Sequence, residues 1–253
     1  MSLLSLLLFV ALWEIVAVWL VHDDTFLPTP VSTAETAVRF MQTPYPDPGL
    51  RLWQHALVST GRILLGWAIG VLIGICLGGM MASVSLLRGL IDPFIELTRP
   101  LPPLAFIPLL IVWFGIGETP KLVLIVIGVI PIMTVATAAA LDRVPADMVD
   151  AARTLGASRA YTLLHVRVRA AAPYILTAMR LSLGVSWTSI VAAEMIVATS
   201  GLGYVILQAS LFLRTSLIFA GIALIGLLGL GLDLVLRLLS RSLDPAGAAM
   251  VSQ

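Results

Sequence analysis

Few residues of this chain have the types and spacing that chemistry requires. The only lysine, Lys121, is not part of the Gly-Lys-Ser/Thr motif that a phosphate-binding P-loop needs. The three histidines, His22, His55 and His165, lack metal-ligand spacing, and Cys76 is the only cysteine. The sequence has no nucleophile elbow and no zincin motif. We therefore expect no catalytic residue, no metal site and no cofactor on this chain, and any ATP to be hydrolysed by another chain.

A charged loop at residues 142–172 separates two intensely hydrophobic segments. Pro145 can begin a helix at its first turn, and Gly156 can take the positive φ that ends one. Ser158 can then cap a second helix that begins at Arg159. The pattern predicts a helix–turn–helix at the membrane surface, with helices at residues 146–155 and 159–168. Its basic residues would meet either lipid headgroups or a protein partner.

The composition predicts an all-α polytopic membrane protein. Hydrophobic residues make up 59% of the 253 residues and charged residues 11%, and the mean hydropathy is +1.04. Soluble domains are about half apolar and about a quarter charged, so this chain needs the bilayer as its solvent. A spanning helix takes about 20 apolar residues. We expect about six transmembrane helices in a single transmembrane domain, residues 1–253, with spans near residues 2–21, 63–84, 101–116, 122–141, 171–197 and 216–239.

The distribution of positive charge predicts the orientation. With the N-terminus inside, ten of the 15 basic residues fall on the inner side and five on the outer side. Inner loops of membrane proteins carry the excess of Lys and Arg, so we expect both termini in the cytoplasm. The net charge of +1 and the lack of a basic stripe argue against nucleic acid as a partner.

Glu194 lies inside the apolar segment at residues 171–197. An ionisable side chain in a span costs about 3 kcal/mol on insertion scales, so Glu194 should face protein or a water-filled path. Two interpretations remain open, namely a hydrogen-bonding partner in helix packing and a residue that lines or gates a translocation path. Trp187, Thr188 and Ser189 lie one to two turns earlier and would line the same path.

The charged loop also resembles a known motif. Asp150-Ala151-Ala152, then Gly156 and finally Pro173 are similar to the EAA loop of binding-protein-dependent ABC importer permeases, with Asp150 where that family mostly has Glu. Four further segments resemble the nitrate/sulfonate/taurine permeases of that family, and taurine permeases most of all. They are Ile95-Glu96-Leu97-Thr98-Arg99-Pro100-Leu101-Pro102-Pro103-Leu104-Ala105, Trp113-Phe114-Gly115-Ile116-Gly117-Glu118-Thr119, Val191-Ala192-Ala193-Glu194 and Gly201-Leu202-Gly203-Tyr204.

The resemblance implies the small (type I) ABC importer permease core, working as a dimer with a second copy of itself in the bacterial inner membrane. It implies that two cytoplasmic ATPases bind the ATP and Mg, and that a periplasmic binding protein delivers taurine or a related alkanesulfonate. The ATPase would grip the loop through Asp150, Ala151, Ala152, Gly156, Ser158, Arg159 and Pro173. The alternatives are a permease for nitrate or another small organic anion, and an ion-coupled secondary transporter. The second would need ionisable residues near the midplane, where Glu194 is the strong candidate, and the halves show no clear internal repeat.

Overall fold

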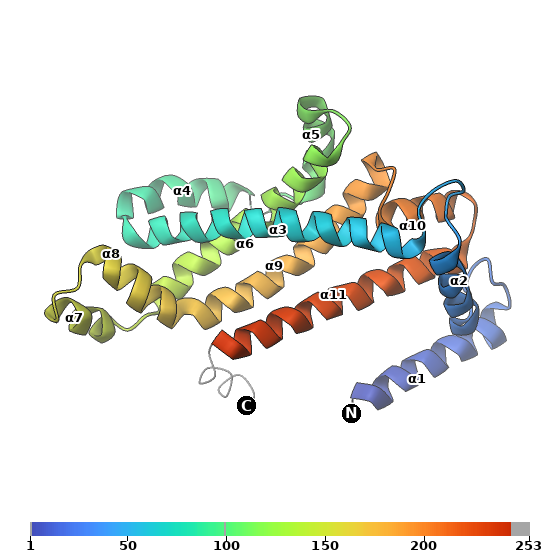
Figure 1. Ribbon diagram of the computed structural model, residues 1–253, viewed down its shortest axis with the longest axis horizontal. Helices are drawn as coiled ribbons and strands as arrows, with labels where there is room; N and C mark the ends of the chain where they lie inside the picture. The colour runs from blue at the N-terminus through green and yellow to red at the C-terminus, as the bar shows by residue number, and fades with distance from the viewer. Residues whose placement is uncertain (1, 99, 244–253) are drawn as a thin grey trace. The chain divides into compact units, whose positions relative to one another are not determined.

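The computed structural model describes residues 2–98 and 100–243, and these residues form helices and their connections (Figure 1). An isolated bridge pairs Pro44 with Arg51. The chain divides into two compact units. The first comprises residues 1–61 and 190–228, and the second comprises residues 62–189 and 229–253. Three long helices, α3 (Leu52–Ser83), α9 (Val168–Val197) and α11 (Thr215–Leu243), pass from one unit into the other.

The first unit is built on short helices around a small apolar core. It contains α1 (Ser2–Ile15), a π-helical continuation at Val16–Val21, α2 (Pro30–Gln42) and α10 (Leu202–Leu211). Helix α2 begins where Thr29 accepts a hydrogen bond from the Ser32 N–H at 3.1 Å, and Pro30 occupies the first turn, where its missing donor costs nothing. The core combines residues from the connection before α3, from the start of α3, from α10 and from α11, namely Tyr45, Leu52, Ala56, Leu202, Val205, Ala209 and Leu217.

The second unit contains α4 (Ser85–Thr98), a 3-10 turn at Pro103–Phe106, α5 (Ile107–Phe114) and α6 (Glu118–Asp142). Beyond α6 the chain forms α7 (Ala146–Thr154) and α8 (Arg159–Tyr161), and a π-helical segment at Thr162–Arg167 leads into α9. The long part of α11 completes this unit.

Helices α3 and α6 run parallel to each other, in register along a stripe of glycines. A Cβ on Gly66 would lie 2.9 Å from the Cβ of Ile125, and a Cβ on Gly70 would lie 2.8 Å from the Cβ of Val129. Gly74 and Gly78 meet Met133 and Thr137 in the same way, so each contact pairs residues 59 positions apart. The stripe lets the two backbones approach closely, as small residues do in membrane helix packing. Because α3 and α6 point the same way, the chain between them must run back in the opposite direction.

The prediction of six spans is not confirmed in number. Within the described residues, four helices are long and apolar enough to cross a membrane: Leu52–Ser83, Glu118–Asp142, Arg159–Val197 and Thr215–Leu239. A fifth crossing is possible if α4 and Pro103–Phe114, which are bent by 91°, act as one broken span. Prolines at 100, 102 and 103 remove backbone donors at this break, which explains why the expected span at 101–116 is not one helix. The expected first span at 2–21 is helical throughout, as α1 and its π-helical continuation, and within its fully described residues the apolar helix covers Leu7–Val21.

Two helix boundaries also differ from the sequence expectation. Helix α3 begins at Leu52 rather than at residue 63. The second loop helix, expected at 159–168, does not end there but runs as one continuous helix from Arg159 to Val197. Pro173 lies inside this helix instead of at the start of a separate span. Residues 168–172 are Val-Arg-Ala-Ala-Ala, and nothing in that run terminates a helix.

Candidate functional site

The turn in the charged loop has the geometry that its sequence predicts. Helix α7 starts after Pro145, and Gly156 adopts φ = 86°, the left-handed conformation that glycine takes at little cost. The N–H of Ala157 bonds the carbonyl of Ala152 at 3.0 Å, which closes the end of the helix. Ser158 caps the next helix by accepting a hydrogen bond from the Tyr161 N–H at 3.2 Å. The predicted roles of Pro145, Gly156 and Ser158 in the backbone are therefore confirmed.

Helix α7 has no buried residue, so its side chains are available to a partner. Leu155, at its end, is 89% exposed, and Met148 is 47% exposed. Asp150, Ala151, Gly156, Ser158 and Arg159 are exposed and Ala152 is half-buried, so six of the seven predicted loop residues lie together at this turn. The seventh, Pro173, lies well along α9 and is not brought to it.

Arg167 braces the base of this loop, which the sequence analysis did not anticipate. Its guanidinium donates to the carbonyl of Leu141 at 3.0 Å and to the carbonyl of Ala82 at 3.3 Å, at the ends of α6 and α3. Cations near the last carbonyls of a helix are favoured by its dipole. Asp142, the last residue of α6, accepts from Arg88 of α4 at 2.7 Å and lies 3.7 Å from Arg167.

Glu194 is buried in the first unit, where it ties the end of α9 to α3 and α10. It is 1% exposed, and the Ser59 hydroxyl is 2.8 Å from each of its carboxylate oxygens. The N–H of Gly203 donates to its Oε2 atom at 3.0 Å. Gly201 lies so close that any Cβ there would collide with the Glu194 carboxylate. Glu194 was expected to face either protein or a water-filled path. It faces protein, because its carboxylate accepts hydrogen bonds from protein groups.

The same region fixes the protonation state of His55, which is 1% exposed. The N–H of Gly201 points at the Nδ1 atom of His55 at 2.9 Å, so Nδ1 must be the acceptor. The Nε2 atom then carries the proton and donates to the carbonyl of Tyr45 at 2.9 Å. Ser59 accepts from the Leu202 N–H at 2.9 Å. His55 and Ser59 therefore each bind one backbone N–H at the start of α10. Burial raises the pKa of the nearby Tyr45 hydroxyl, against the opposing charge of Arg214.

The residues predicted to accompany Glu194 do not form one lining surface. Trp187 and Ser189 are buried, whereas Thr188 is exposed and its hydroxyl donates to the carbonyl of Val185 at 2.9 Å. Neighbouring residues on a helix point about 100° apart, so three in a row cannot share a face. Trp187 packs beside Gly229 of α11, where a Cβ would lie 3.5 Å from its indole nitrogen.

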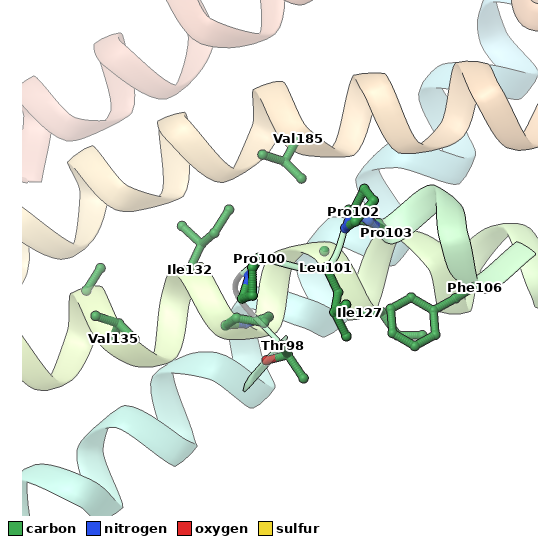
Figure 2. Close-up of a pocket in the computed structure, with 13 residues that line it drawn as sticks. Thr98, Pro100, Leu101, Pro102, Pro103, Phe106, Ile127, Ile132, Val135 and Val185 are labelled. Atoms are coloured by element: carbon green, nitrogen blue, oxygen red, sulfur yellow. The ribbon is translucent and has the colours of Figure 1, made fainter. Parts of the chain in front are cut away.

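A cavity of about 460 Å³ lies in the second unit beside the proline-rich break. Figure 2 shows Pro100, Pro102, Pro103 and Phe106 among its lining residues, together with Ile127, Ile132 and Val135 of α6 and Val185 of α9. Among the described residues that line it, Thr98 alone has a polar side chain. Among the described residues, no group of three or more His, Cys, Asp or Glu could hold a metal ion.

These features define a class of protein, an all-helical polytopic membrane protein with an exposed helix and turn between two apolar helices. Residues 70–246 match the family described as binding-protein-dependent transport system inner membrane component. The chain belongs to this family and is a permease subunit of an ABC transporter. Membership decides between the two transporter classes that the sequence left open, against an ion-coupled secondary transporter.

Three curated relatives indicate where in the family the chain lies. The taurine transport system permease protein TauC of Escherichia coli K12 is 40% identical over 97% of this chain and 89% of its own length. The putative aliphatic sulfonates transport permease protein SsuC of Bacillus subtilis is 32% identical over 92% and 83%. The nitrate import permease protein NrtB of Synechococcus elongatus is 30% identical over 94% and 87%.

The solved structures show the fold. The MetNI methionine ABC transporter, in an inward-facing conformation, matches with a TM-score of 0.62 at 20% identity, over 76% of this chain and 93% of that one. The expected all-α ABC permease fold is confirmed by this likeness.

Proposed function

We propose that two copies of this chain form the translocation path of a bacterial importer for taurine or a related alkanesulfonate. A periplasmic binding protein delivers the substrate, and two cytoplasmic ATPases drive transport through the loop at residues 142–172. Both termini lie in the cytoplasm, and the chain forms a single permease domain, residues 1–253. ATP and Mg are bound by the ATPases and not by this chain.

The observation that carries the substrate is the identity of 40% to a taurine transport permease along almost the whole chain, together with the sulfonate permease at 32%. The nitrate permease at 30% keeps small inorganic anions as the second candidate. All three candidates are monoanions or carry an anionic group. An anionic substrate is therefore common to the alternatives.

The exposed α7 supports the proposed coupling role. A helix with no buried residue and with Leu155 almost fully exposed gains stability only when a partner covers it. Arg167 ties the base of this loop to the ends of α3 and α6, so a push on α7 moves two long helices rather than a loop alone. ATP then drives transport by favouring one of two states of the permease pair.

Uptake by proteoliposomes tests the proposal. The permease, its ATPase and its binding protein are reconstituted with ATP inside, and uptake of taurine, ethanesulfonate and nitrate is compared. We expect ATP-dependent uptake of the two sulfonates that persists in the presence of a protonophore. Uptake of nitrate alone would show that the substrate is nitrate and not a sulfonate. Uptake without ATP would refute the ATP-driven mechanism.

A further inference from the structure

Two buried cations of the second unit converge on one exposed carboxylate. Arg62 of α3 is 7% exposed and Lys121 of α6 is 3% exposed. The Nε atom of Arg62 lies 2.6 Å from the Oε2 atom of Glu118, and its Nη2 atom lies 2.7 Å from Oε1. The Nζ atom of Lys121 lies 2.9 Å from the same Oε1 atom. The Glu118 side chain is 59% exposed, so the anion faces outward while both cations lie behind it.

The packing of α3 against α6 fixes the two cations. Arg62 and Lys121 are 59 positions apart, the same offset as Gly66 with Ile125 and Gly70 with Val129. They are therefore the next pair along the glycine stripe, on two helices held close together. Glu118 differs, because it is the first residue of α6 and follows the glycine-containing turn at residues 115–117. The donors are positioned by rigid helices, whereas the carboxylate sits at a helix end with room to move.

The donors that hold the Glu118 carboxylate can also hold a sulfonate. A guanidinium presents parallel N–H groups that match two oxygens of an oxyanion, and a lysine adds a point charge. A sulfonate has three oxygens and can engage both cations at once. Replacing the Glu118 carboxylate by a sulfonate exchanges one monoanion for another, so the charge of the cluster stays the same. Burying charged side chains is costly in a membrane protein, and such groups commonly mark substrate pathways.

The cluster also lies at a suitable end of the molecule. Helix α6 has 25 residues and is about 37 Å long at 1.5 Å per residue. Glu118 and Lys121 are at its start, and the loop proposed to meet the ATPase follows its other end. The cluster is therefore at the opposite end of α6 from the ATPase loop, where a delivered substrate would arrive.

We propose that Arg62 and Lys121 form an anion-binding site for the headgroup of the substrate, and that Glu118 is its built-in occupant, which the substrate displaces. The inference rests on the proposed function for the identity of the anion, a sulfonate. Glu118 keeps the two cations paired when no substrate is present. When the substrate displaces Glu118, one anion is exchanged for another, so Arg62 and Lys121 are never left buried without an anionic partner.

Equilibrium binding of labelled taurine and ethanesulfonate tests the site. The permease is purified with its ATPase in phosphatidylcholine nanodiscs, without the binding protein. Glu118→Gln keeps the shape of the side chain but removes the competing charge, so we expect the affinity for both sulfonates to rise at least tenfold. A gain of binding cannot come from misfolding. The matched control is Glu96→Gln, an exposed residue of α4, which should leave the affinity unchanged.

Further arms separate the possible outcomes. Lys121→Gln added to Glu118→Gln should abolish the gain, and unchanged affinity in the Glu118→Gln variant would overturn the site. A gain for nitrate but not for sulfonates would support the site and remove the sulfonate as substrate. Phosphatidylglycerol competes for the site if a lipid phosphate is its occupant. Binding of labelled phosphatidylglycerol to the Glu118→Gln variant, with no binding of either sulfonate, would overturn the assignment to substrate.

Discussion

Ser59→Ala tests whether the buried network around Glu194 holds the start of α10. The Ser59 hydroxyl, 0% exposed, donates to Glu194 and accepts from the Leu202 N–H at 2.9 Å. Removing it deprives two buried groups of a partner, each at a cost of about 1–3 kcal/mol, although Glu194 keeps the N–H of Gly203. We take the net cost as about 2 kcal/mol, which is about a 30-fold change in the equilibrium for local opening.

Hydrogen exchange measures this opening directly. In the purified complex, the Leu202 amide of Ser59→Ala should exchange about 30 times faster than in the unmodified protein, and the Gly203 amide should follow. Ser210→Ala is the matched control, because Ser210 is exposed and its hydroxyl donates only within α10, to the carbonyl of Leu207. Its effect should stay within about 0.5 kcal/mol. Equal protection of Leu202 in Ser59→Ala and in the unmodified protein would refute the reasoning.

Three more predictions concern the loop, the glycine stripe and Glu194. Gly156→Val should insert in the membrane but lose substrate-stimulated ATP hydrolysis, because φ = 86° strains a β-branched residue, whereas Gly156→Asn should keep most of it; normal stimulation in the valine variant would contradict this. Gly70→Ala should lower the melting temperature of the complex, since its Cβ meets Val129 at 2.8 Å, at a cost of about 1–3 kcal/mol. Gly79→Ala, with nothing within 4 Å, should not, and equal melting temperatures would refute close packing. Glu194→Gln should reduce uptake of taurine and ethanesulfonate together, because its oxygens bond protein groups; a loss confined to taurine would show that the carboxylate reads the ammonium group.

The sequence was sufficient where a signal is local. Hydropathy identified long apolar helices, because an excess of apolar surface is a property of each segment alone. The turn at Gly156 and the cap at Ser158 were predictable since a positive φ and a capped N-terminus depend on one or two residues. The four-residue spacing of the glycines in α3 places them on one helix face, but it does not show that α6 is the partner of that face.

The exact helix boundaries needed the structure. The number of spans remained open because prolines near residue 100 break one apolar segment, and the angle of that break, 91°, depends on packing. The extension of α9 back to Arg159 was missed, because a proline inside a helix and a proline at its start have the same local signature.

Partners far apart in the chain were decided by the tertiary structure alone. Ser59 meets Glu194 across 135 positions, and Arg62 meets Glu118 across 56. From the sequence, Glu194 was only an ionisable residue in an apolar span. Arg62 and Lys121 were only two of the five basic residues assigned to the outer side of the membrane. Hydropathy and local dihedral preferences say which residues are costly to bury. Which group compensates each one depends on the register of packed helices, which no single segment encodes.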